Sequence, residues 1–497
     1  MTTASQIIGS SMPAVPIVSK HKAQVYSAVL VMIGIPVLCI AGGEAGLLRI
    51  VLPLLSALVG AFLLWRSKPV YVGLVFWLWF LTPFLRRVAD YQGGWTQSSA
   101  VLLAPYITAG LAGFSLLTSF QIFHSRRSVP YVCALVAIGY GLIIGLLQYP
   151  LFNVMQALLN WAVPVVFGLF IYENRELYPE MRKVIESCFL YGVLLTGAYG
   201  IYQFFTLPDW DKMWLLNVQT NSFGAIEPME IRAFSTMNAP VIFAAVMASG
   251  LLVLFNLKGK LRLIAAACGF VGLILTISRA SWLSLVAGGI FLMARMEMRQ
   301  RFRLAMGVVA CAVVTLCLTA VPVVHDLLWQ RIQTFSDPSQ DVSYSARVEG
   351  HEAAFSELSQ EPFGEGLGST DTKHATEGDD DMIGPHDSTI LESLYSLGWI
   401  GTVIFIAGLV TLGLQLARTG RSRDPFVLSA QAVLVGFLAQ CLLNSVLLGV
   451  LGFMVWTFAS LCLAEADREV EISAQADQES DEETNQGTDA AVDYATI

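Results

Sequence analysis

Long apolar stretches recur along nearly the whole chain and constrain its fold more than any other feature. A helix needs about 20 residues to cross a hydrocarbon layer of roughly 30 Å. The stretches are continuous and lack the alternating ten-residue pattern of outer-membrane strands, so they predict an all-α polytopic transmembrane bundle of about 12–14 spans. The fourteen candidate spans are 25–42, 47–65, 69–85, 100–119, 129–148, 151–172, 185–206, 238–257, 261–277, 281–295, 304–324, 394–416, 426–446 and 448–464.

Composition and charge exclude several other classes of protein. A share of 55% hydrophobic against 13% charged residues rules out a soluble domain. All eight cysteines fall in apolar spans, where a free thiol acts as a small hydrophobe, so neither a disulfide framework nor a zinc site is expected. Residues 325–388 hold fourteen acids and 465–497 hold eleven, which makes nucleic acid an unsuitable partner.

The distribution of Lys and Arg predicts the orientation. If the N-terminus is cytoplasmic, twenty of the 29 basic residues fall in cytoplasmic turns or ends, as the excess of positive charge in such loops requires. Lys20 and Lys22 directly precede the first span and no small-residue cleavage site follows it, so no cleavable signal is expected. Both termini are therefore predicted to be cytoplasmic.

This orientation divides the chain into five parts. The predicted order is a cytoplasmic N-terminus (1–24), eleven spans (25–324), one large, partly helical outward-facing loop (325–388), three spans (389–464) and an acidic cytoplasmic tail (465–497). The tail is poor in large apolar residues and is predicted to be disordered. Two smaller outward regions, 86–99 and 207–237, are polar as well.

The large loop, residues 325–388, is longer than a simple connection between two spans needs to be, and loops of this length usually have a function or are disordered. Residues 345–358 have helical spacing of apolar residues and predict an amphipathic helix. The run 361–369 (EPFGEGLGS) follows, and its alternate glycines, Gly364, Gly366 and Gly368, suit a tight backbone turn near a ligand. A plain flexible loop explains the same glycines equally well.

Ionisable residues at the outward ends of spans are candidates for chemistry. His386 lies where the loop re-enters the membrane and could act as a general base, although four of the six histidines are outward. Arg279 stands at a boundary between two spans, where it either binds an anion or extends its guanidinium to the interface. Arg347 and Arg232 also lie near helix entries, and converging guanidinium groups would suit a diphosphate.

The acidic run 379–381 (DDD) offers carboxylate ligands for a divalent ion. A solvated surface run is the more ordinary explanation, so no metal site and no cofactor are assigned to the chain.

The order of these motifs resembles the bacterial O-antigen ligase and O-antigen or exopolysaccharide polymerase superfamily, best between about 230 and 410. The pieces that carry the resemblance are 232–240 (RAFSTMNAP), 276–283 (TISRASWL), Arg347, 362–368 (PFGEGLG) and 386–401 (HDSTILESLYSLGWIG). Asp387 replaces the usual Asn, and Ser396 stands where an acidic residue is common. Asp387 could change the charge and orientation of His386.

The resemblance implies that a glycan is transferred, without a required metal, from an undecaprenyl-diphosphate carrier to a sugar hydroxyl at the periplasmic face. Arg279 and Arg347 would then hold the diphosphate, His386 would be the base, and Arg232, Gly366 and Gly368 would contact the substrate. The implied partners are the lipid-linked glycan, membrane lipid and a chain-length regulator protein.

Three alternatives stay open. A ligase would transfer the glycan to lipid A core, whereas a polymerase would extend another lipid-linked repeat; residues 86–107 favour the polymerase. A transporter or lipid-linked glycan flippase has a similar number of spans, but it usually needs ionisable groups near the midplane. A glycosyltransferase with metal-binding acids in its first outer loop is disfavoured, because 43–46 (GEAG) has no Asp-x-Asp.

Overall fold

The structure is a computed structural model that describes residues 17–218, 221–320, 362–370, 388–418 and 424–494. These ranges contain helices and turns and no strand; the one β-type pairing in them is an isolated bridge between Gly224 and Ile231. The all-α prediction is confirmed for this part of the chain.

The helices follow the predicted spans closely, and each of the fourteen apolar stretches coincides with at least one helix. Ten helical segments of the described ranges are long and apolar enough to cross a membrane, and three further apolar helices, α10, α11 and α18, are shorter. The elements are α1 (Ile17–Ala41), α2 (Leu48–Arg66), α3 (Lys68–Gly93), α4 (Leu103–Gly110), α5 (Ala112–Thr118), α6 (Val129–Gln148), α7 (Leu151–Glu173), α8 (Tyr178–Thr206), α9 (Asp209–Val218), α10 (Pro240–Leu254), α11 (Leu261–Leu275), α12 (Arg279–Arg295), α13 (Met298–Leu318), α17 (Thr389–Arg418), α18 (Pro425–Gln440) and α19 (Gly449–Tyr494), with short 3-10 turns between some of them.

Ion pairs gather the basic turns at one end of the bundle, which we call the basic end. Arg127, before α6, pairs with Asp467 of α19 at 2.7 Å, and Arg175, before α8, pairs with Glu471 of α19 at 2.8 Å. Arg182 of α8 pairs with Asp424, the residue before α18, at 2.7 Å. The opposite end, called the loop end, holds the connections 94–99, 207–218, 221–239 and 276–278 and the turn 362–370.

Helices α12 and α18 pack antiparallel and very closely. A Cβ on Gly436 would lie 2.5 Å from the Ser284 hydroxyl, and one on Gly288 would lie 2.8 Å from the Ala432 carbonyl oxygen. Small residues at such contacts let helix backbones approach in a membrane, where packing rather than water exclusion drives association. The start of α12 therefore lies beside the end of α18, at the loop end.

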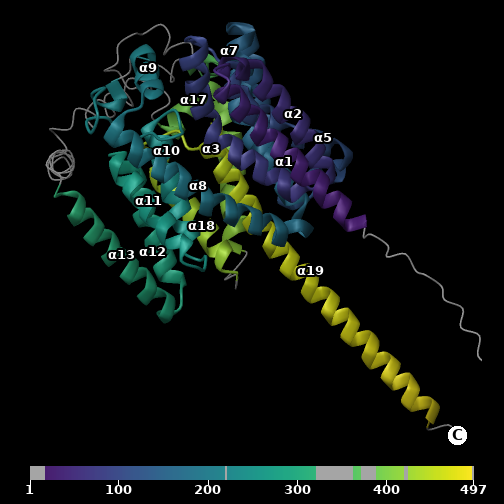
Figure 1. The fold of residues 1–497 in the computed structure, drawn as a ribbon. Coiled ribbons are helices and arrows are strands. Elements are labelled where there is room, and N and C mark those ends of the chain that lie inside the picture. Colours follow the sequence, from purple (N-terminus) through teal and green to yellow (C-terminus); the bar gives the residue numbers. More distant parts are fainter. Residues whose placement is uncertain (1–16, 219–220, 321–361, 371–387, 419–423, 495–497) are drawn as a thin grey trace, which may run out of the picture.

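Two elements extend further than the sequence predicted. Helix α3 continues through Arg86, Arg87 and Asp90 to Gly93, so most of the polar region 86–99 is helix rather than loop. Helix α19 leaves the bundle as one long rod that ends at Tyr494, where the composition predicts disorder from residue 465 (Figure 1). Its first turns past Ala464 are held by the ion pairs of Asp467 and Glu471, and no proline interrupts the rest.

The packing of α12 can be tested with two adjacent glycines. Gly288→Ala should destabilise the protein by about 1–3 kcal/mol, because the added methyl overlaps Ala432 and Leu252. Gly289→Ala is the matched control: no atom lies within 4 Å of its Cβ position, and alanine favours a helix. Thermal unfolding of the purified protein in detergent should give a lower midpoint for Gly288→Ala alone, and equal midpoints would contradict this packing.

Candidate active site

Two of the predicted motifs contact each other at the loop end. The Arg232 Nε donates to the Thr276 carbonyl at 2.9 Å, and the backbone N–H of Ala233 donates to the Leu275 carbonyl at 3.0 Å. Thr276 lies three residues before Arg279, the first residue of α12. Both arginines are half-buried. The structure therefore brings Arg232 to the turn that carries Arg279.

The two contacting segments have unusual backbone conformations. Ser235 has a φ of 52° and Ile277 a φ of 54°, both in the left-handed region. A β-branched residue is a genuine outlier there, and such strain persists only where the surroundings hold it. The strained turn ends at Arg279, which places a guanidinium at the helix N-terminus, where the helix dipole also favours an anion.

A buried polar network holds the first of these segments. Arg87, on α3, pairs with Asp211 of α9 at 2.7 Å, and neither side chain is exposed at all. The Arg87 guanidinium also donates to the carbonyls of Ser235 and Met237. Gln203 of α8 accepts the N–H groups of Phe234 (3.0 Å) and Ser235 (2.7 Å). Side chains from two helices, α3 and α8, thus satisfy the irregular backbone that follows Arg232.

The glycine turn packs between α6 and α17. Gly364, Gly366 and Gly368 all have positive φ, of 73°, 88° and 95°. Leu367 between them is fully buried, and its N–H donates to the carbonyl of Gly141 on α6 at 2.9 Å. A Cβ on Gly366 would overlap the backbone of Gly145, so the glycines permit a close approach of the chain to α6. Their contact with substrate stays a prediction.

Two buried carboxylates, one from the turn and one from α17, lie where the turn contacts α17. The N–H of Glu365 donates to the Tyr395 carbonyl at 3.1 Å, and its Oε2 accepts from the Tyr149 hydroxyl at 3.0 Å. Glu392, on the first turn of α17, accepts from the hydroxyls of Thr370 (3.2 Å) and Ser396 (3.3 Å). Ser396, which stands where an acidic residue is common, therefore lies next to a carboxylate one turn earlier.

The end of α18 is where the separate motifs meet. The start of α12, with Arg279, lies beside it through the contacts of Ser284 and Gly288. The start of α17 lies there too, because the Thr389 N–H donates to the Cys441 carbonyl at 3.0 Å and its hydroxyl donates to the Asn444 carbonyl at 2.8 Å. Thr389 is three residues past His386. His386 itself, Arg347 and the acidic run 379–381 lie outside the described residues.

The described residues contain no group of three or more His, Cys, Asp or Glu side chains that could hold a metal ion. No functional role was predicted from the sequence for Arg87, Asp211, Gln203, Glu365 or Glu392. The sequence does show isolated polar residues beside apolar spans, and burying such residues costs free energy unless they have a partner. Their partners are distant in sequence, so the pattern alone could not pair them.

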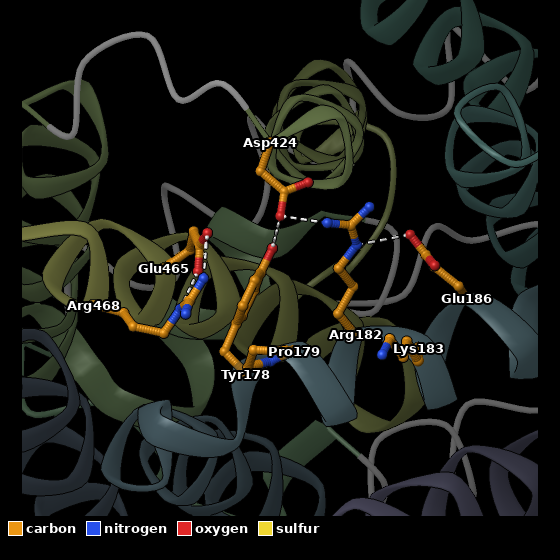
Figure 2. A pocket seen from close by; sticks show the side chains of 8 residues that line it. All are labelled: Tyr178, Pro179, Arg182, Lys183, Glu186, Asp424, Glu465 and Arg468. Carbon is orange, nitrogen blue, oxygen red and sulfur yellow. Dashed lines mark hydrogen bonds and ion pairs between the residues drawn. The ribbon is translucent and has the colours of Figure 1, made fainter. Parts of the chain in front are cut away.

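A pocket of about 310 Å³ lies at the basic end and is separate from this site. Figure 2 shows Asp424 accepting from Tyr178 and Arg182, and Glu465 paired with Arg468. Asp424 precedes α18, whose sixteen residues span roughly 24 Å before the loop end is reached. The arginines of this pocket are neutralised by the carboxylates that line it.

Comparison with known proteins supports the motif assignment. Residues 264–406 match the family model for O-antigen ligase, a range that includes Arg279, the glycine turn and the start of α17. No curated protein and no solved structure matches the chain. The family consists of glycosyltransferase-like O-antigen ligases and polymerases with lipid-linked glycan substrates. Through this stretch, the polytopic helical membrane protein is similar to members of the O-antigen ligase-like superfamily.

Proposed function

We propose that the chain polymerises undecaprenyl-diphosphate-linked oligosaccharide repeats in exopolysaccharide or O-antigen assembly, at the periplasmic face of the bacterial inner membrane. The observation that supports this most is the contact of the Arg232 guanidinium with the Thr276 carbonyl, at the turn that carries Arg279. Two guanidinium groups from separate motifs are thereby gathered at one end of the bundle. Guanidinium donors match the oxygens of a diphosphate two at a time.

The proposed reaction is a single inverting displacement. The acceptor hydroxyl oxygen attacks the anomeric carbon of the donor glycan while the bond from that carbon to the diphosphate oxygen breaks. His386 takes the hydroxyl proton, and undecaprenyl diphosphate leaves with the electron pair of the broken bond. Arg279 and Arg347 stabilise the charge that develops on the leaving group, an electrostatic contribution that is usually the largest in such transfers. Arg232, Gly366 and Gly368 contact the substrate.

The placement of buried charge favours an enzyme over a transporter or flippase. The buried charged residues of the described ranges are Arg86, Arg87, Asp90, Asp211, Glu365, Glu392, Asp424 and Glu465. Each lies near the end of a span or in a turn, and none at the middle of a span. Alternating-access carriers place their coupling groups near the midplane. A ligase that transfers the glycan to lipid A core fits the same site and is the second candidate.

Arg279 is the direct test of the anion site. Arg279→Ala should lower turnover by about 10²–10³-fold, the usual loss when a charge-stabilising donor is removed. Arg279→Lys should recover only part of it, since an ammonium cannot bind two oxygens in a fork. Arg295→Ala, at the other end of the same helix, is the matched control and should keep wild-type activity. Rates of glycan formation in membranes with equal amounts of each variant provide the measurement, and wild-type rates for Arg279→Ala would exclude this site.

His386→Ala in the native host should separate the two candidate functions. Loss of the base should leave lipid-linked single repeats without polymer if the chain is a polymerase. Full-length polymer that is not attached to lipid A core would identify a ligase instead. Gel analysis of glycan size gives the result, and normal glycans in both His386→Ala and Arg347→Ala strains would remove the catalytic assignment.

A further inference from the structure

Arg87 is the most completely enclosed cation in the described part of the chain, and its contacts are directional. Its side chain is fully buried. Its Nε pairs with the Asp211 carboxylate, Nη1 donates to the Met237 carbonyl at 2.5 Å, and Nη2 donates to the Ser235 carbonyl. The guanidinium also faces the ring of Phe234, 4.9 Å from its centroid. A fully enclosed side chain cannot reach a substrate, so any influence of Arg87 on the reaction has to pass through other residues.

Asp211, on α9, connects Arg87 to helix α8. Its Oδ2 accepts from the Tyr199 hydroxyl at 2.7 Å and from the Gln203 Nε2 at 2.6 Å. Gln203 in turn accepts the N–H groups of Phe234 and Ser235. The left-handed Ser235 is anchored a third time, because its hydroxyl donates to the Thr196 carbonyl at 2.5 Å. Residues 234–237 are therefore fixed through their own peptide groups.

The fixed backbone begins two residues after Arg232. Arg232 and Ala233 make the contacts to Thr276 and Leu275 that join this loop to the turn before α12. A shift of residues 234–237 would move both contacts, and with them the turn that ends at Arg279. The path from the buried pair to the turn before Arg279 runs through the hydrogen-bonded backbone of residues 232–237 and the Arg232 side chain.

We propose that Arg87 and Asp211 form a positioning pair that holds Arg232 and Arg279 at the geometry needed to bind the diphosphate of the lipid-linked donor. This inference rests on the proposed function. It assigns no contact with substrate to either residue, and it predicts a loss of donor affinity that is separable from a loss of folding.

Binding of undecaprenyl diphosphate to the purified full-length protein in lipid nanodiscs tests the proposal. Asp211→Asn should weaken binding by about tenfold or more, the range seen when a partner that orients a ligating group is removed. The matched control is Asp90→Asn. Asp90 is equally buried and pairs with Arg86 and Arg49, but these residues hold the connection 93–97 rather than 232–237. Asp90→Asn should bind the probe as the wild type does.

A double variant separates positioning from stability. Replacing both partners of a buried ion pair by apolar residues is often neutral for stability, whereas removing one partner is strongly destabilising. Arg87→Met with Asp211→Leu should therefore have a higher thermal midpoint than either single variant, although the carbonyls of Ser235 and Met237 lose their donor, and should still bind undecaprenyl diphosphate weakly. Arg87→Lys should also bind weakly, since one ammonium cannot reproduce both carbonyl hydrogen bonds together with the ion pair to Asp211.

Three results would overturn the inference. The first is equal weakening by Asp211→Asn and Asp90→Asn, and the second is full recovery of binding in the double variant. If Asp211→Asn does not accumulate in the membrane, Tyr199→Phe is used instead, because it removes one hydrogen bond to the same carboxylate. The third result is an unchanged affinity of Tyr199→Phe for undecaprenyl diphosphate. If Arg279→Ala binds undecaprenyl diphosphate as tightly as the wild type, the proposed anion site is wrong. The inference about Arg87 and Asp211 would then be wrong as well, because it rests on that site.

Discussion

Every peptide group inside a membrane must find its hydrogen-bond partner within the protein, and the loop end of this bundle is organised by that constraint. Helices satisfy it by themselves, but residues 232–238 do not form a helix. Gln203 and Arg87 supply the missing donors and acceptors from neighbouring helices. Buried polar side chains are costly unless they are fully partnered, so the network and the irregular backbone stabilise each other. Neither could persist here without the other.

The glycine turn meets the same constraint in a different way. Residues 362–370 bond directly to the backbones of α6 and α17, through the carbonyls of Gly141 and Tyr395. Such contact requires two backbones to approach without side chains between them, and Gly145, Gly366 and Gly398 make this possible. Gly398 interrupts α17 with a φ of 61°, at the point where a Cβ would overlap the carbonyl of Phe363. The kink and the turn therefore depend on each other.

The sequence predicted the spans and their order, because hydropathy over 20 residues is a local property. The motif residues were chosen from short local patterns, and their roles stay predictions. The sequence did not predict that α3 would continue to Gly93, because charged residues after an apolar span are typical of a loop. The partner that allows Arg87 to be buried, Asp211, is distant in the sequence. The helix past residue 465 was missed for a related reason, as the basic groups that hold its first turns lie before α6 and α8. Contacts between distant segments, including that of Arg232 with Thr276, required the structure.

Helix α18 contacts the basic end, the start of α12 and the start of α17, and so fixes their positions relative to one another. At the basic end, Asp424 is bound by Tyr178 and Arg182, and along its length Gly436 and Ala432 leave no space against α12. At its other end the Cys441 carbonyl receives the start of α17. Close-packed interfaces resist small displacements, so the first turns of α12 and α17 keep a fixed separation. In the proposed reaction the leaving group and the acceptor are held from these two turns. Donors that need no rearrangement as charge develops are the ones that accelerate such a displacement most.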